Sequence, residues 1–417
     1  MFSDHFKRIR KKSAKTQKDI AEYLNISAQS ISKWETGESV PSINYLPQLA
    51  AFLGCSINAF FDEEELSRFE DCCVSFDSFE KRKNFKDRIN NAFKHFNIMA
   101  EVVETFDSVS VVTYKMIMRH GVGIKEILGR ADDIRYYLGV NGVRFITDKY
   151  EGKYFSIEIA KTAFDELELT NEELTSLLTP LEYHLPIVLG KDIDNNLIFD
   201  DLARLCHLLV AGVSGTGKTT FLWGVIRALT ACLTPEELKF VIIDPKKCEF
   251  SSLEGNSYLF DDVVYNHLQA KNTLKNVLQE IKRRKQLMKA VGVISVEKYT
   301  EATGKRLERI VVLIDELIDF VIIDSEMEEL LIEITMKGRS AGVHLIIATA
   351  LPSETMLPSL ILCNVPSRIA YKLNKKEDSV RVINSPDATM LGTRGDMLYS
   401  PIMVDRPIRI QAMYTSP

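Results

Sequence analysis

One eight-residue segment has the residue types and spacing to bind the phosphates of a nucleotide. Residues 212–219 have the sequence GVSGTGKT and fit the pattern G-x-x-x-x-G-K-[ST] at every fixed position. Glycines let backbone N–H groups curl around phosphate oxygens, and a following helix directs its positive end at them. We expect Lys218 to reach the β- and γ-phosphates and the Thr219 hydroxyl to ligate Mg²⁺. The predicted cofactors are ATP and Mg²⁺, and the predicted nucleotide-binding residues are Gly212, Val213, Ser214, Gly215, Thr216, Gly217, Lys218, Thr219 and Thr220.

A second segment ends in two adjacent carboxylates that suit metal binding and water activation. The apolar run 310–314 leads directly into Asp315 and Glu316. We expect Asp315 to hold Mg²⁺, directly or through water, and Glu316 to polarise the attacking water. Alone this pattern is weak, because many strands end in Asp-Glu before a turn. Its place downstream of a matching phosphate-binding loop in one α/β unit makes it strong.

Both segments need strands that end at one edge of a sheet. From Leu181 onward apolar strands alternate with helical stretches, which predicts a largely parallel sheet covered on both faces. The phosphate-binding loop follows the first core strand, where an open α/β sheet places its ligand. Asp244 fits a strand-terminating turn, and Lys246 and Lys247 could equally be solvent-facing charges. The predicted strands are 207–212, 239–244, 309–315, 343–348, 368–373 and 396–399.

The amino-terminal residues 1–61 are predicted to form five short helices. The second and third have the spacing of a helix-turn-helix, which lays its second helix in the DNA major groove. Gln29 can pair bidentately with adenine, and Lys33 can reach guanine or phosphate. The alternative is a helical protein-interaction module without DNA contact, since the excess of basic side chains is modest. The predicted helices are 2–12, 17–23, 27–34, 43–53 and 57–61.

Between these two parts we expect an acidic linker and a small α+β domain. The linker spans 62–80 and is a solvated charge run. The domain spans 81–165 and contains no catalytic constellation. Its predicted helices are 85–96 and 123–138, and its predicted strands are 100–104, 109–118, 143–147 and 154–158.

Composition bounds the class of protein. The net charge of −6 over 417 residues means that any nucleic-acid contact comes from a local patch. The seven scattered cysteines have no C-x-x-C spacing, which favours neither a disulfide framework nor a zinc site. No secretory signal and no run near the ~18 apolar residues of a membrane span is present, so we expect a cytoplasmic chain.

The amino-terminal segment resembles the Cro/repressor-type (XRE-like) helix-turn-helix family. That resemblance implies that Gln17 touches phosphate and that Ala28, Gln29, Ser30 and Lys33 face base edges. The matching positions are Thr16-Gln17, Ile20-Ala21, Leu24, Ile26-Ser27, Ile31-Ser32 and Trp34-Glu35.

From about residue 81 to the end, the chain resembles the FtsK/SpoIIIE family of DNA-translocating ATPases. The resemblance implies a RecA-like P-loop motor over 166–417 that assembles as a hexameric ring around double-stranded DNA. It also implies that 81–165 matches the smaller domain attached to such motors. The segments that carry it are 185–193, 201–203 with 207–212, 243–246, the strand before Asp315, 338–345, 364–370 and 391–398.

In such a ring the nucleotide lies between subunits, so a neighbour supplies a cationic finger. Arg339 and Arg368 occupy matching basic positions, although either can be an intrachain partner instead. The family's Ala-Thr-Gln after the fourth strand is Ala348-Thr349-Ala350 here, so γ-phosphate sensing is weakened or passes to Thr349. The chain also ends at Pro417 without the family's winged helix, and we expect the helix-turn-helix to recognise DNA in its place.

The sequence thus predicts a RecA-like α/β motor domain preceded by a small α+β domain and an all-α helix-turn-helix domain. The expected function is an ATP-driven DNA translocase of a bacterial mobile element, acting in conjugative transfer or partitioning. A relaxase or membrane-embedded transfer machinery is the expected partner. The alternative is a DNA-binding regulator with an ATP-dependent oligomerisation switch; an NTPase acting on protein cargo is disfavoured by the helix-turn-helix.

Overall fold

A computed structural model describes most of the chain. The predicted linker 62–80 falls largely outside the described residues, which are 2–13, 15–24, 26–42, 45–53, 55, 57–63, 79–119, 123–140, 143–147, 154–161, 166–247, 249–317, 325–354, 356–402 and 406–415. The chain divides into two compact units, each described by itself. The first comprises Met1–Val103, Met116–Asn141 and Thr147–Phe155, and the second comprises Glu104–Lys115, Gly142–Ile146 and Ser156–Pro417.

The amino-terminal part of the first unit is a helical bundle, as the sequence predicts. Ser27 begins the third helix by accepting a hydrogen bond from the Ser30 N–H at 3.2 Å, and Gly37 ends it in the left-handed conformation at φ 80°. The apolar faces meet in a core that includes Phe6, Ile20 and Ile31, all fully buried. The elements are α1 (Phe2–Lys12), α2 (Gln17–Leu24), α3 (Ala28–Thr36), α4 (Leu46–Leu53) and the 3₁₀-helix η2 (Ile57–Phe60).

A four-stranded sheet with three helices forms the small α+β part. Its strand order is β1-β2-β4-β3, with β3 antiparallel to β4. The predicted helix 123–138 is two helices, because Arg130 leaves the helical conformation at φ −106° and ψ 12°. The elements are α6 (Phe79–His95), β1 (Ala100–Asp107), β2 (Val111–Met118), α7 (Ile124–Gly129), α8 (Ala131–Leu138), β3 (Val143–Ile146) and β4 (Tyr154–Ala160).

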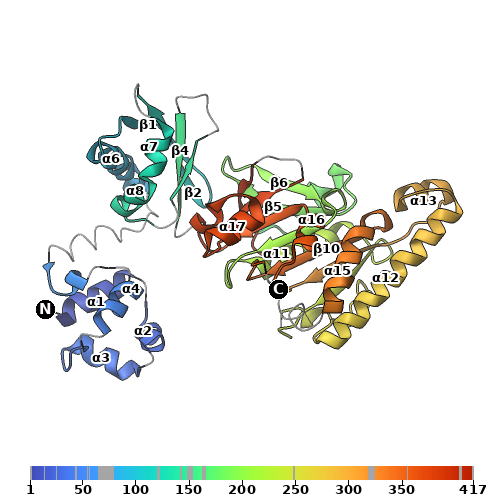
Figure 1. The fold of residues 1–417 in the computed structure, drawn as a ribbon, viewed down its shortest axis with the longest axis horizontal. Coiled ribbons are helices and arrows are strands. Elements are labelled where there is room, and N and C mark those ends of the chain that lie inside the picture. The colour runs from blue at the N-terminus through green and yellow to red at the C-terminus, as the bar shows by residue number, and fades with distance from the viewer. Residues whose placement is uncertain are drawn as a thin grey trace. The chain divides into compact units, whose positions relative to one another are not determined.

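A nine-stranded sheet organises the second unit (Figure 1). Its order is β6-β5-β13-β12-β11-β7-β10-β9-β8. The strands are β5 (Pro186–Asp192), β6 (Leu197–Asp201), β7 (Leu208–Ala211), β8 (Leu238–Ile243), β9 (Arg309–Ile314), β10 (Val343–Thr349), β11 (Ser367–Tyr371), β12 (Asp396–Ser400) and β13 (Ile408–Ala412).

The expectation of a largely parallel sheet holds for one half only. Strands β11, β7, β10, β9 and β8 are parallel neighbours, whereas β11-β12, β12-β13, β13-β5 and β5-β6 pair antiparallel. The connections β5–β6 and β12–β13 are shorter than the crossover of about a dozen residues that parallel strands need, so each joins an antiparallel pair. The sheet is therefore mixed.

Helices cover both faces of the parallel half. Alternate strand residues such as Leu209 and Val312 face one apolar cluster, while Val210 and Leu313 face another. The first cluster is closed by α12 (His267–Ala290) and α15 (Ser325–Lys337), which lie side by side in Figure 1, and the second by α11 (Lys218–Cys232). Shorter helices complete the unit: α9 (Asn171–Leu178), η3 (Thr179–Leu181), α10 (Leu202–Leu205), η4 (Ser251–Leu253), α13 (Val296–Thr303), η5 (Arg339–Ala341), α16 (Ser359–Asn364), α17 (Lys376–Ile383) and η6 (Pro386–Met390).

The outer side of β8 is covered by the chain itself. Phe240 exchanges backbone hydrogen bonds with Tyr258 and Phe260 at 2.7 and 2.8 Å, and the Val264 N–H donates to Ile242 at 2.9 Å. The strand thus has partners on both sides although it is the last in the sheet. Across the described ranges, none of the helices has the length and apolar character that a membrane crossing requires.

Candidate nucleotide site

The phosphate-binding loop leaves the middle of the sheet. β7 lies between β10 and β11, and the loop begins where β7 ends, with the Gly212 N–H bonded to the Thr349 carbonyl at 3.1 Å. A side chain at Gly212 would place its Cβ 2.5 Å from the Cβ of Tyr371, so only glycine fits there. Gly217 has φ 115° and caps the amino terminus of α11, so the loop curls back directly into a helix. The strand–loop–helix predicted from the sequence is present.

Lys218 is buried inside this loop. Its ammonium donates to the carbonyls of Gly212 at 2.6 Å and Val213 at 3.2 Å. Burial lowers the pKa of Lys218, because desolvation penalises the charged form. The Thr219 hydroxyl, one residue on, donates to Oδ1 of Asp315 at 3.0 Å. The structure thus brings the two predicted metal-binding oxygens into contact beside the predicted phosphate-binding lysine.

Asp315 and Glu316 follow β9, two strands away from β7. Asp315 is buried, and Oε1 of Glu316 accepts a hydrogen bond from the Ala350 N–H at 3.0 Å. Burial raises the pKa of Glu316, while the Ala350 N–H, Lys218 and the Thr349 hydroxyl oppose that rise. Ala350 stands where the family has a glutamine, and its backbone N–H and the Thr349 hydroxyl contact Glu316, the predicted general base.

The donor set fits a magnesium nucleotide. Mg²⁺ in phosphate sites takes only one or two protein oxygens and completes its shell with phosphate and water. Thr219 and Asp315 offer two such oxygens, and within the described ranges no group of three or more His, Cys, Asp or Glu side chains could hold a metal without further ligands. The amino terminus of α11 and the loop N–H groups supply the anion-binding partners. The site therefore suits a metal that arrives with a triphosphate.

Sequence reasoning missed one lysine of this site. Lys246 lies in the turn after β8, and its ammonium contacts Oδ2 of Asp315 at 2.7 Å. Its side chain is 37% exposed, so Lys246 faces solvent in part and contacts Asp315 as well. The turn itself is as predicted: the buried carboxylate of Asp244 accepts the N–H groups of residues 246, 247, 249 and 250. The adjacency of β8 and β9 brings Lys246 to Asp315, and that adjacency cannot be deduced from the motif alone.

The turn 391–396 contacts the phosphate-binding loop. The Gly395 N–H donates to the Thr216 carbonyl at 2.9 Å, and the Gly395 carbonyl accepts from the Ala412 N–H at 2.8 Å. Gly395 has φ 89°, and a Cβ there would lie 2.7 Å from the Gln411 amide nitrogen. The turn is thus fixed between β13 and the loop.

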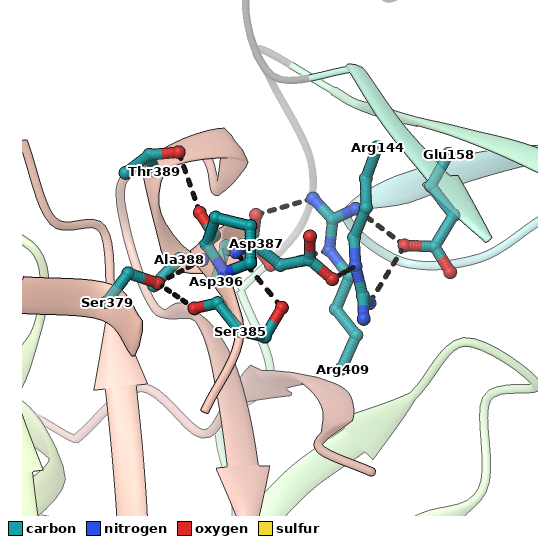
Figure 2. Close-up of polar contacts among 10 residues, drawn as sticks. Arg144, Glu158, Ser379, Ser385, Asp387, Ala388, Thr389, Asp396 and Arg409 are labelled. Carbon is teal, nitrogen blue, oxygen red and sulfur yellow. Dashed lines mark hydrogen bonds and ion pairs between the residues drawn. The ribbon is translucent and has the colours of Figure 1, made fainter. Parts of the chain in front are cut away.

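A buried ionic network holds this turn in place (Figure 2). Arg409 binds Asp396 through two hydrogen bonds of 2.9 and 2.7 Å and binds Glu158 of β4 at 2.9 Å. Arg144 of β3 contacts the same Glu158 at 3.5 Å and reaches Asp387 of η6 at 2.7 Å. All five residues belong to the second compact unit. The segments 143–146 and 156–160 are therefore tied to the strands that support the phosphate-binding loop.

The two candidate finger arginines lie in different environments. Arg368 donates to four backbone carbonyls, those of residues 362, 365, 381 and 382, at 3.0 to 3.3 Å. Arg339 is exposed at the start of η5, immediately before β10. Because β10 and β7 are parallel, Arg339 lies at the amino ends of the strands while the phosphate-binding loop lies at their carboxyl ends. Arg339 and the loop of one molecule are on opposite edges of the sheet.

In the helix-turn-helix, α3 presents most of the predicted base-reading residues. Ala28, Gln29 and Lys33 are exposed, and Ser30 is half-buried with its hydroxyl 3.0 Å from that of Ser27. These side chains lie on one side of a 9-residue helix, and Ile31, Trp34 and Glu35 on its other side are buried in the bundle. An exposed polar helix face of this kind is what major-groove recognition requires.

Gln17 begins α2 and is held by an internal carboxylate. Its amide nitrogen donates to Oε2 of Glu35 at 2.7 Å. Glu35 is buried and also binds Arg10, which donates through Nε and, at 3.1 Å, through Nη2. Gln17 therefore has a fixed orientation at the amino terminus of α2, where phosphate contact is predicted.

Three family models match successive parts of the chain. The helix-turn-helix model matches residues 6–60, the FtsK alpha domain matches 71–160, and the FtsK/SpoIIIE family matches 181–354. The second and third of these cover the segments that form the small α+β part and the phosphate-binding site.

Curated relatives extend the likeness over most of the chain. A DNA translocase FtsK of Caldanaerobacter subterraneus subsp. tengcongensis is 32% identical over 331 residues, covering 79% of this chain and 47% of the relative. The DNA translocase SpoIIIE of Bacillus subtilis is 29% identical over 340 residues, covering 79% and 43%. The chain thus spans about half the length of the curated relatives it matches.

Solved structures share the fold. The monomer form of the pCW3 conjugation coupling protein TcpA with ATPgS aligns at a TM-score of 0.55 and 19% identity, covering 80% of this chain and 96% of that one. The cytoplasmic domain of the Type VII secretion ATPase EccC of Thermomonospora curvata aligns at 0.52 and 22%, covering 56% and 29%. These likenesses confirm the predicted RecA-like P-loop fold of the second unit.

Proposed function

Because this chain belongs to the FtsK/SpoIIIE family, we propose that it is an ATPase that moves along double-stranded DNA. The observation that carries the proposal is the contact of Thr219 with Asp315, beside Lys218 and Glu316, in a chain that also has a helix-turn-helix. The cluster of polar side chains serves ATP binding and hydrolysis, and the helix-turn-helix serves recruitment to DNA.

The site residues have three roles in hydrolysis: phosphate binding, metal binding and water activation. The loop N–H groups and Lys218 bind the β- and γ-phosphates, while Thr219 and Asp315 supply oxygen ligands for the metal. Mg²⁺, when bound, offsets the charge of the phosphate oxygens. Glu316 accepts the proton of a water as that water's oxygen bonds to the γ-phosphorus and the bond to the β–γ bridging oxygen breaks. Its hydrogen bond to the Ala350 N–H fixes the carboxylate for this step.

A neighbouring copy completes the site. Arg339 is exposed and lies on the sheet edge opposite to its own phosphate-binding loop, so it can reach only the nucleotide of another molecule. Arg368 uses its donors on four carbonyls of its own chain, which favours Arg339 as the finger. We infer a head-to-tail homo-hexameric ring around duplex DNA, in which each copy supplies Arg339 to the next.

The helix-turn-helix recruits this ring to particular DNA. The exposed face of α3, with Gln29 and Lys33, supports base contact. A motor with its own DNA-reading module suits a mobile element that must find and move one molecule among many. We propose conjugative transfer or partitioning as the setting, with a relaxase or membrane-embedded transfer machinery as partner.

An ATPase assay with and without linear duplex DNA tests the motor. We expect phosphate release to rise several-fold with duplex and to vanish in Glu316→Gln protein, which retains the loop. Equal rates with and without duplex would exclude a DNA-driven motor.

Displacement of a labelled third strand from a triplex separates the motor from a nucleotide-dependent oligomerisation switch. A translocase removes the third strand only with hydrolysable ATP. A regulator would assemble on the DNA with ATPγS and with ATP alike and leave the third strand in place.

A further inference from the structure

A second lysine is fixed at the nucleotide site by the turn after β8. Four backbone N–H groups, those of residues 246, 247, 249 and 250, converge on the fully buried carboxylate of Asp244 at 3.0 to 3.2 Å. Lys247 adopts a left-handed conformation at φ 63°, which closes the turn. Such a turn fixes the backbone of Lys246 at the carboxyl edge of the sheet, so the approach of its side chain to Asp315 is built into the fold.

The ammonium of Lys246 shares the metal-binding carboxylate with Thr219. Lys246 Nζ contacts Oδ2 of Asp315 at 2.7 Å, while the Thr219 hydroxyl contacts Oδ1 at 3.0 Å. The Asp315 side chain is 0% exposed but that of Lys246 is 37% exposed. The carboxylate is therefore fully enclosed, whereas the long side chain that carries the cation reaches solvent.

The ammonium of Lys246 balances negative charge at the phosphate-binding loop when a triphosphate is present. Lys218 and Lys246 both interact with Glu316, and Lys246 helps to lower the pKa of Lys218 after the larger effect of burial. Two ammonium groups thus balance two carboxylates. A magnesium triphosphate adds net negative charge next to the carboxyl groups of Asp315 and Glu316, and a second cation beside Lys218 helps to offset that charge.

We propose that Lys246 is a phosphate-binding and positioning residue. It orients Asp315 toward Thr219, and its ammonium turns to the triphosphate oxygens when Asp315 ligates Mg²⁺. The inference rests on the proposed ATPase function, and it adds a second lysine, outside the phosphate-binding loop, to the residues that grip the nucleotide.

Equilibrium binding of a fluorescent ATPγS analogue with Mg²⁺ tests the inference without turnover. Loss of one charge-assisted hydrogen bond should weaken binding by Lys246→Met protein about 10- to 100-fold. Lys246→Arg should recover most of the affinity, because it restores the cation. Lys247→Met, a change in the same turn, should bind as the unmodified protein does. Equal affinity of the Lys246→Met and unmodified proteins would overturn the proposal.

A double substitution separates phosphate binding from mere neutralisation of Asp315. In an Asp315→Asn background, with EDTA present, Lys246→Met should still weaken binding of the analogue, because its contact is to the triphosphate. No further loss in that background would restrict Lys246 to holding Asp315 and refute the phosphate contact. Thermal unfolding without nucleotide verifies that each variant is folded. Failure of the unmodified protein to bind the analogue would instead refute the proposed function itself.

Discussion

The Gly395 N–H donates to the Thr216 carbonyl at 2.9 Å, which joins the turn before β12 to the centre of the phosphate-binding loop. The next residue, Asp396, is bound by Arg409, and Arg409 by Glu158 of the small sheet. Three polar contacts therefore connect β4 to the phosphate-binding loop: Glu158 to Arg409, Arg409 to Asp396, and Gly395 to Thr216. A displacement of residues 156–160 should displace the Thr216 backbone through these contacts.

Removing the cation of this network should destabilise the second unit. Arg409→Met removes the cation bound to buried Asp396 and leaves Glu158 only its 3.5 Å contact with Arg144, and losing one member of a buried ion pair costs about 3–5 kcal/mol. Urea unfolding followed by fluorescence measures the change. Arg283→Met, which removes an exposed ion pair to Glu280, is the control and should cost under ~1 kcal/mol. Equal effects of the two substitutions would show that the network contributes no special stability.

Lys218→Ala should separate the two proposed activities, nucleotide hydrolysis and DNA binding. Without the ammonium the loop loses its contact with the β- and γ-phosphates, so we expect nucleotide binding and hydrolysis to be lost. DNA binding by the helix-turn-helix should stay within about twofold in fluorescence anisotropy, because α3 belongs to a separate bundle with its own core. Loss of both activities would contradict independent modules.

The pattern of residues was enough to predict the centre of the site. The loop 212–219 and the pair Asp315-Glu316 were predictable because each lies in one local strand–turn unit, and parallel strands bring such units to the same edge. The antiparallel half was not predictable from periodicity. In β13 the buried positions include the polar residues Arg409 and Gln411. Their burial is possible because Asp396 and Glu158 bind Arg409 and the Arg394 carbonyl binds Gln411.

The remaining misses have similar physical causes. Lys246 belongs to the site only because β8 pairs with β9, and sequence spacing does not reveal strand order. The break at Arg130 replaces one predicted helix by two, because the apolar periodicity continues across the residue that leaves the helical conformation. The boundaries of the predicted domains and the roles of Arg339, Gln17 and the α3 residues remain predictions.

Glu316→Gln should abolish hydrolysis while preserving nucleotide binding. Loss of a general base lowers the rate about 10²- to 10⁴-fold. In the unmodified protein the raised pKa of Glu316 should place the acid limb of the rate profile above the ordinary glutamate value of ~4.3. Turnover measured between pH 4.5 and 8 gives this limb, and an acid limb at or below the ordinary value would contradict the assignment.

The same substitution should change stability with pH. Because the folded state raises the pKa of Glu316, that state binds the proton more tightly than the unfolded chain does. Stability from this group is therefore present below the unfolded pKa and lost as pH rises through the folded pKa. Glutamine cannot ionise, so Glu316→Gln should raise the melting temperature at pH 8 and have a diminishing effect toward pH 4. A constant difference across that range would contradict burial as the cause.

The two arginines should respond in opposite ways. Arg339→Ala should leave the melting temperature unchanged but lower turnover about 10³-fold, as loss of an arginine finger does. Arg368→Ala should lower the unfolding free energy by at least about 2 kcal/mol, since four carbonyls lose their donor. Mixing Arg339→Ala with Lys218→Ala protein should restore part of the turnover. An inactive mixture would argue against action between copies.

DNA recognition should depend on two residues of α3 in different ways. On sites that the protein selects from a random library, Gln29→Ala should cost about 1–3 kcal/mol and relax the sequence preference. If Lys33 contacts phosphate, Lys33→Ala should weaken all sequences alike and lower the salt dependence of binding by about one unit. Anisotropy titrations at several salt concentrations distinguish these effects. Unchanged selection after Gln29→Ala would favour a protein-interaction role for the bundle.

The covered outer side of β8 limits how copies can meet. Exposed strand edges are templates for intermolecular β-pairing and aggregation, but the backbone groups of Phe240 and Ile242 already have partners in residues 258–264. Another copy cannot extend the sheet there. Contacts between copies at that end must instead be made by side chains. Such contacts can form and break repeatedly, whereas pairing along an unpaired strand edge leads to aggregation.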